Sequence, residues 1–209
     1  MMTPRLLWGG MTLVAAFFLV ASPARSDDPA KKPDASKANA EMEAYMKAGT
    51  PGPEHKRLDS LAGSWAFTIK MWMDPNQKTP TESSGTAERR WILSGRFLQE
   101  DVHSQFMGQP FTGFGIMGYD NIQKKYTTMW IDSMTTAIGT SLGTADASGK
   151  VITFEGTHLD PLTGKPVKGR DVLRLLDNNH QNMEAFKVGP DGKEFKVMEI
   201  HFTRKAKAN

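Results

Sequence analysis

Two residues near the C-terminus have side chains that could perform acid–base chemistry together. Glu199 and His201 are two positions apart, so on a β-strand the carboxylate and the imidazole point to the same side. Such a pair is suited to proton transfer or to metal binding. Arg174, in another segment with strand-like alternation, could hold an anionic group. These three residues support one hypothesis for an enzyme, an isomerase or hydrolase that acts on a small molecule.

A metal site is not predicted, because two ligands do not complete one. The sequence contains neither H-x-H nor H-E-x-x-H, and the other histidines are His55, His103, His158 and His180. Haem, which one histidine holds in some barrels, is kept as a minor alternative with His201 as its donor. No other cofactor is expected.

Residues 113–118 read Gly-Phe-Gly-Ile-Met-Gly and match the G-x-G-x-x-G of dinucleotide-binding proteins. That motif cradles pyrophosphate only where a strand leads into a helix. Here the turn at Asp120-Asn121 leads to another strand instead. The match is therefore interpreted as coincidental, and the glycines as places where a strand bends or a neighbouring group approaches closely.

Asp132 and Ser133 could suggest a nucleophile, but the sequence has no G-x-S-x-G elbow. Both residue types commonly bind the backbone amides of turns. We interpret the pair as the start of a turn.

The first 26 of the 209 residues have the pattern of an export signal. A short basic start is followed by an uncharged apolar run over 6–21, and Ala24-Arg25-Ser26 offers a cleavage site. The apolar run is short for a membrane span of about 20 residues, so no stable membrane anchor is expected after cleavage. The sequence predicts a bacterial protein that is exported to the periplasm or secreted.

Charge and cysteine content exclude several classes of function. Without Arg5 and Arg25 of the signal, the 26 basic residues fall to 24, against 23 acidic ones. With charges this balanced, the protein has no long-range positive field that would attract nucleic acid, and no nucleic-acid partner is expected. The chain has no cysteine, which excludes thiol nucleophiles, iron–sulfur clusters and thiolate zinc sites.

The rest of the chain divides into a linker and one domain. Residues 27–52 read as a flexible linker with a short helix near 40–46, 53–205 as the domain, and 206–209 as a frayed end. After a helical turn over 55–62, ten segments alternate with period two and are separated by short turns. Short connections favour antiparallel hairpins, and ten strands avoid exposed edges by closing. The expected fold is an all-β, antiparallel up-and-down barrel preceded by short helices.

Gly63-Ser64-Trp65, at the start of the first strand, resembles the G-x-W signature of the lipocalin and fatty-acid-binding superfamily. The resemblance implies that Trp65 plugs one end of the barrel and that Arg204 packs over its ring. Further motifs include Leu93-Ser94-Gly95-Arg96-Phe97 and Trp130-Ile131-Asp132-Ser133-Met134. With them, the chain from about Pro53 to Lys205 resembles the bacterial DUF1579 family, which implies a lipocalin-like barrel without an established activity.

One face of each strand of a barrel points inward, and the sequence leaves open which one. If the faces with charges point inward, a small amphipathic or apolar ligand would meet a set of mixed side chains: Trp91, Phe114, Met129, Glu155, Arg174, Phe186, Glu199 and His201. If the opposite faces point inward, these charges face water around a packed core. The main prediction is ligand binding in the barrel without catalysis; the alternatives are the enzyme above and a structural or interaction domain with a filled barrel.

Overall fold

The computed structural model describes residues 35–206, apart from 162 and 190. The predicted signal peptide and the start of the linker lie outside the described residues. In chain order the elements are α1 (Ala35–Ala48), α2 (Pro53–Lys56), the 3₁₀ helix η1 (Arg57–Leu61), β1 (Gly63–Met71), β2 (Thr81–Ile92), β3 (Phe97–Phe106), β4 (Gln109–Asp120), β5 (Lys125–Asp132), β6 (Gly139–Ala145), β7 (Val151–Leu159), β8 (Pro166–Leu175), β9 (His180–Val188) and β10 (Glu194–Arg204).

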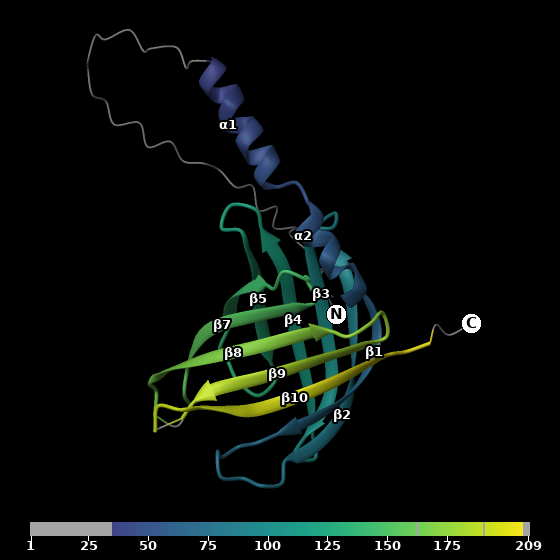
Figure 1. Cartoon of the computed structure of the whole chain (residues 1–209), viewed down its shortest axis with the longest axis vertical. Helices are drawn as coiled ribbons and strands as arrows, with labels where there is room; N and C mark the ends of the chain where they lie inside the picture. Colours follow the sequence, from purple (N-terminus) through teal and green to yellow (C-terminus); the bar gives the residue numbers. More distant parts are fainter. Residues whose placement is uncertain (1–34, 162, 190, 207–209) are drawn as a thin grey trace, which may run out of the picture.

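The ten strands form a closed antiparallel barrel in which each strand pairs with its neighbours in sequence and β1 pairs with β10. The predicted fold class is therefore confirmed. β7 to β10 form one layer that crosses the layer of β2 to β5 steeply, as orthogonally packed sheets do (Figure 1). The interior is the space between these two layers.

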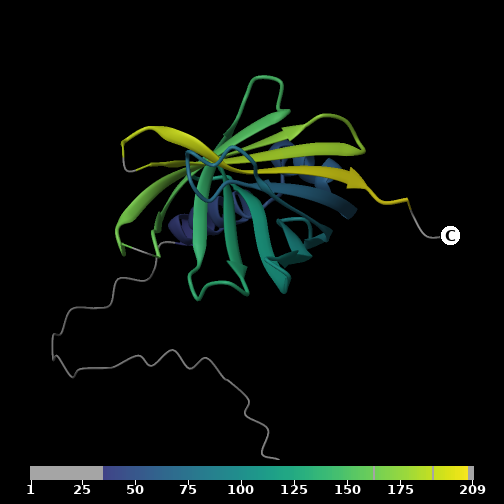
Figure 2. The same cartoon turned by 90° about the horizontal axis from the view of Figure 1, so that it is seen from below.

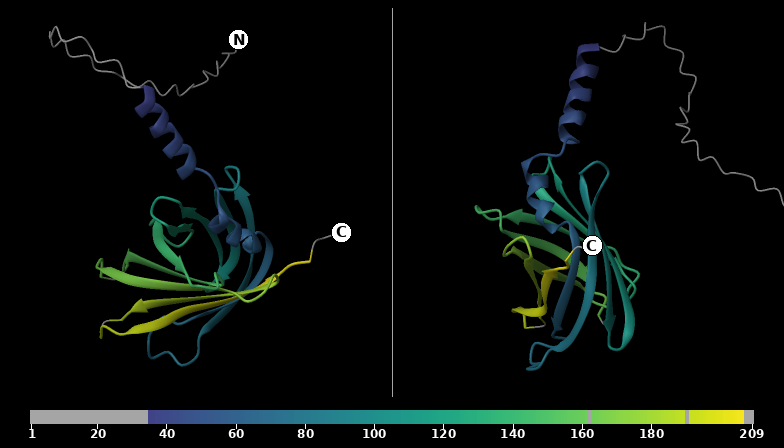
Figure 3. Two further views of the ribbon diagram at one scale, coloured as in Figure 1. Left: turned by 45° about the horizontal axis from the view of Figure 1, so that its top comes forward. Right: turned by 90° about the vertical axis from the view of Figure 1, so that its right-hand side faces the viewer.

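Helix α1 is longer than the short helix expected near 40–46. Several alanines, which have the highest helix propensity, extend it over Ala35–Ala48. It stands away from the barrel beyond α2, and its side chains Met42, Tyr45 and Met46 are exposed (Figures 1 and 3). None of the described helices is long and apolar enough to cross a membrane.

The next two helices plug one end of the barrel. Leu58 and Leu61 of η1 are 0% and 1% exposed and pack into a cluster with Leu98, Tyr126 and Ile152. The barrel is seen from below in Figure 2, with the helices behind the strands. A second cluster, built around Trp65, Phe67 and Phe202, adjoins the first. The core is therefore concentrated toward the plugged end.

The glycines of the 113–118 motif lie within β4, and β5 follows after a turn, so they do not lead into a helix. A Cβ on Gly113 would come within 2.4 Å of the Trp130 ring, and one on Gly115 within 3.2 Å. The motif therefore makes room for an indole on the neighbouring strand, in agreement with the close approach expected from the sequence.

Candidate functional site

The plugged end is held by a short series of contacts around Trp65. Its indole nitrogen donates a hydrogen bond to the Leu61 carbonyl at 2.9 Å, and its side chain is fully buried. The Arg204 guanidinium lies 4.2 Å from the centre of the indole ring and donates to the carbonyls of Ser60 and Ala62, both at 2.6 Å. This is the arrangement that the G-x-W resemblance implied, and it closes this end of the barrel.

A charged cluster lies on the inner face directly below the plug. Arg89 of β2 pairs with Glu100 of β3 at 2.7 Å and donates to the amide oxygen of Gln181 on β9 at 2.6 Å. Its guanidinium also lies 4.4 Å from the centre of the Phe202 ring. The arginine joins the two layers, and its charge is neutralised by Glu100.

Farther from the plug, the inner face is apolar but incompletely covered. Strand registers place five apolar side chains on this face, and each is only partly buried: Ile69, Phe111, Trp130, Met183 and Ile200. An inward apolar side chain with remaining exposure indicates that its neighbours leave space that solvent can reach. We call this set the apolar wall.

Asp171 of β8 is an acidic side chain on the inner face of the same layer as Met183 and Ile200. The register places it between Phe154 of β7 and Ala185 of β9, which are 4% and 7% exposed. Burial among such neighbours raises the pKa of Asp171 to about 6, against an opposing effect of the Arg170 charge. The carboxyl group forms no hydrogen bond or ion pair with another described residue, although it is only partly covered.

Most of the side chains that the sequence suggested as a lumen set point outward. Trp65 and Phe67 face inward on β1, so Phe202 and Ile200 face inward on β10, and the residues between them face out. The same alternation around the barrel puts seven members of the set on the outer surface: Phe114, Met129, Glu155, Arg174, Phe186, Glu199 and His201. The lumen placement of these residues is corrected accordingly, and the arrangement is the alternative in which the charges face water.

Trp91 is the one member of that set on the inner face. Its indole nitrogen donates to the Asp59 carboxylate of η1 at 2.9 Å, and the ring packs against the cluster at the plug. It fastens the plug and is separate from the apolar wall.

The three residues of the enzyme hypothesis belong to one network on the outer surface. Lys196 bridges Glu184 and Glu199 at 2.6 Å each, His201 contacts Glu199 at 2.6 Å, and Arg174 lies 3.6 Å from Glu184. The hydrogen bond from Lys196, followed by that from His201, lowers the pKa of Glu199. A carboxylate held in its ionised form by two donors is a poor proton acceptor.

His201 does not fit the role of a haem ligand inside the barrel. It points away from the interior, and its two ring nitrogens lie 2.9 Å from Asn182 Oδ1 and 2.6 Å from Glu199 Oε1. Within the described part of the chain, no three acidic or histidine side chains gather closely enough to hold a metal ion.

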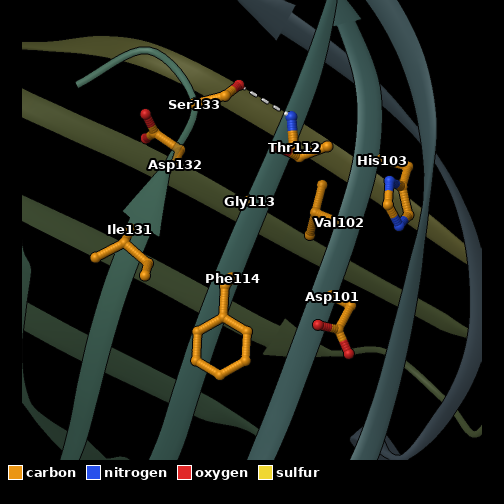
Figure 4. A pocket seen from close by; sticks show the side chains of 9 residues that line it. All are labelled: Asp101, Val102, His103, Thr112, Gly113, Phe114, Ile131, Asp132 and Ser133. Atoms are coloured by element: carbon orange, nitrogen blue, oxygen red, sulfur yellow. Dashed lines mark hydrogen bonds between the residues drawn. The ribbon is translucent and has the colours of Figure 1, made fainter. Parts of the chain in front are cut away.

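A shallow hollow of about 370 Å³ lies over β3, β4 and β5, on the side facing away from the other layer (Figure 4). Its polar groups include the turn residues Asp132 and Ser133. Asp132 accepts hydrogen bonds from the amides of Met134 and Thr135, and Ser133 accepts one from Thr112. As interpreted from the sequence, the pair caps a turn.

Fold and interior together define a class: a calycin-like, closed ten-stranded β-barrel that is plugged at one end by short helices. The family model for proteins of unknown function DUF1579 matches residues 50–204, and the chain belongs to this family. No curated protein matches the sequence.

Solved structures agree on the fold. Rv2717c from M. tuberculosis is 18% identical with a TM-score of 0.56, over 75% of this chain and 100% of that one. The S-type phycobiliprotein lyase CPES from Guillardia theta is 10% identical with a TM-score of 0.51, over 78% of this chain and 98% of that one. At these identities the similarity establishes the barrel alone.

Proposed function

We propose that this protein is a binding protein that takes a small, largely apolar molecule between the two layers of its barrel. The observation that carries the proposal is the apolar wall, whose five inward side chains remain partly exposed. Exposed apolar surface is unfavourable by roughly 25 cal/mol per Å², and a ligand would cover it. Asp171 adds a polar group to the same interior.

The uneven burial of side chains along the barrel also supports the proposal. Fully buried side chains concentrate at the plug, where Leu58, Leu61 and Trp65 are at most 1% exposed. A barrel filled by its own side chains would have comparable burial along its whole length. The uneven burial supports a binding interior over the structural role.

A fluorescence experiment tests this function. We expect the neutral, apolar dye N-phenyl-1-naphthylamine to brighten on binding the wild-type protein and to be displaced by apolar molecules. Ile200→Trp enlarges an inward side chain of β10 and should abolish dye binding; the matched control Ile131→Trp makes the same change on the outer face of β5, where the side chain is 39% exposed. Equal dye binding by both folded variants would exclude the interior as the site.

Native mass spectrometry of protein purified from its exporting host complements the dye. A stoichiometric adduct that Ile200→Trp lacks and Ile131→Trp keeps would give the mass of the natural ligand.

The proposed place of action is outside the cytoplasm, as the N-terminal pattern indicates. N-terminal sequencing of the protein recovered from the periplasm or medium should begin at Asp27. Recovery of a full-length cytoplasmic protein would overturn export and leave the binding proposal to its own test.

A further inference from the structure

The interior has one acidic group whose surroundings specify more than an apolar ligand. Asp171 lies on the inner face of β8, and its two cross-strand neighbours are the phenyl ring of Phe154 and the methyl group of Ala185. Leu173, the next inward residue of the same strand, is 5% exposed. The carboxyl group of Asp171 therefore has apolar inward neighbours on all three strands: Leu173 on β8, Phe154 on β7 and Ala185 on β9.

The charged groups around Asp171 are engaged elsewhere. Arg170, the adjacent residue, faces outward and binds both oxygens of Glu194 at 2.9 and 2.5 Å. Arg89, the cation of the inner cluster, is paired with Glu100 and Gln181. Lys187, the inward residue of β9 beyond Ala185, has its amine 5.4 Å from the centre of the Phe195 ring. No described cation binds Asp171.

His158 is the remaining titratable group to consider on the neighbouring strand β7. His158 pairs with Val167, four residues along β7 from Phe154, which pairs with Asp171. Its side chain is exposed, and its ring lies 3.6 Å from where a Cβ on Gly169 would be. It forms no hydrogen bond or ion pair with Asp171. Among the described residues, no cation or histidine thus forms a hydrogen bond or ion pair with the carboxyl group of Asp171.

An ionised carboxylate among apolar side chains is costly unless a cation or several donors neutralise it. Burial raises the pKa of Asp171 to about 6, so the group is still ionised at neutral pH. Charge-assisted hydrogen bonds to an ammonium or amidinium group are about twice as strong as neutral ones. An anionic ligand would meet repulsion here, and a neutral one would leave the charge uncompensated.

We propose that Asp171 anchors a positively charged nitrogen of the ligand, whose apolar body lies against the wall formed by Ile69, Phe111, Trp130, Met183 and Ile200. The ligand class is a cationic amphiphile such as an alkylamine. This inference rests on the proposed binding function and specifies, in addition, that the ligand carries a positive charge.

Competition with the neutral dye tests the inference, using octylamine, 1-octanol and octanoate as probes of nearly equal apolar length. At pH 7.5 octylamine should displace the dye at a concentration about tenfold lower than 1-octanol does, and octanoate should be weakest. Asp171→Asn keeps the shape and removes the charge, so it should abolish the preference for the amine while 1-octanol binds as before. Asp177→Asn, in the exposed β8–β9 turn, is the matched control and should keep the preference.

The outcomes separate the two proposals. If no probe displaces the dye, or the dye itself does not bind, the binding function is wrong. If 1-octanol and octylamine bind equally well to the wild type, or the preference survives in folded Asp171→Asn, the interior binds ligands but the anchor is wrong. The preference should also disappear at pH 4.5, where Asp171 is protonated and the amine is still charged; persistence there would overturn the role of this carboxylate.

Discussion

The guanidinium of Arg204, the last residue of β10, lies 4.2 Å from the centre of the ring of Trp65, which is near the start of β1. These two residues are also direct register partners, so their strands close the barrel where the plug sits. Arg204 additionally donates to the carbonyls of Ser60, Ala62 and Asn178. One side chain therefore connects the plug, the first strand and the turn between β8 and β9.

Arg204→Ala should lower the free energy of unfolding by about 2–4 kcal/mol, because it removes three hydrogen bonds from a charged donor and one cation–π contact. Urea denaturation monitored by tryptophan fluorescence measures the change. Arg174→Ala, which loses only a 3.6 Å contact on the outer surface, should cost under about 1 kcal/mol. Equal effects of the two substitutions would refute the special position of Arg204.

Gly63→Ala should destabilise the protein more than an ordinary substitution of a turn glycine. Gly63 has φ of +119°, and a Cβ there would lie 2.5 Å from Nη1 of Arg204. Gly95→Ala is the control, since it has φ of +78° and nothing within 4 Å of the added Cβ. We expect about 1 kcal/mol for backbone strain alone at Gly95 and roughly 2 kcal/mol or more at Gly63. Thermal unfolding of the two variants compares them.

Asp171→Asn should stabilise the unliganded protein at neutral pH. The folded protein holds this proton with a pKa of about 6, above the ordinary value of 3.8, so stability falls as pH rises between these values and the cost is complete above pH 6. Removing the carboxylate should raise the free energy of unfolding by about 1–3 kcal/mol near pH 7.5 and by little near pH 4. Denaturation at both pH values measures this difference.

Asp120→Asn is the control of opposite sign. Hydrogen bonds from Gln123, and next from the Ile122 amide, lower the pKa of Asp120, so its contribution is present at neutral pH and is lost as pH falls through the folded pKa. This variant should therefore be less stable than the wild type at neutral pH. If Asp171→Asn also destabilises there, the carboxylate has a structural role that contradicts the assignment above.

Arg89→Met should cost about 3–5 kcal/mol, because it leaves Glu100 without its cation in a largely covered site. The double variant Arg89→Met with Glu100→Leu removes both charges and should recover most of that loss. A double-mutant cycle by chemical denaturation gives the coupling free energy between Arg89 and Glu100. If the losses in the free energy of unfolding were additive, the two charges would act independently.

Sequence patterns predicted the ten strands because each one alternates in hydrophobicity between strong turn signals. Each of the ten expected segments corresponds to one strand of the barrel. The expected helix over 55–62 became α2 and a 3₁₀ helix, a tighter form whose last residue, Leu61, accepts the Trp65 hydrogen bond. Such local geometry depends on contacts that no single segment contains.

The sequence contains enough information to orient the two faces of β10. If Arg204 lies over Trp65, then Phe202 and Ile200 share its inward face, and His201 and Glu199 must point outward. That parity alone excludes the lumen placement of the pair. The inward position of Asp171 cannot be predicted in this way, because it depends on the register of β8 with two other strands. In the sequence alone, Asp171 beside Arg170 looks like one member of an ordinary ion pair on the surface.

The pairing of β1 with β10 has a consequence for how the protein reaches its folded state. Every other strand contact joins neighbours in sequence, but this one joins the beginning of the domain to its end. A ribosome-bound chain cannot complete the barrel until Arg204 has emerged, and the long-range contact between β1 and β10 slows closure. Until then β1 and the most recently formed strand present open edges, which are sites for aggregation.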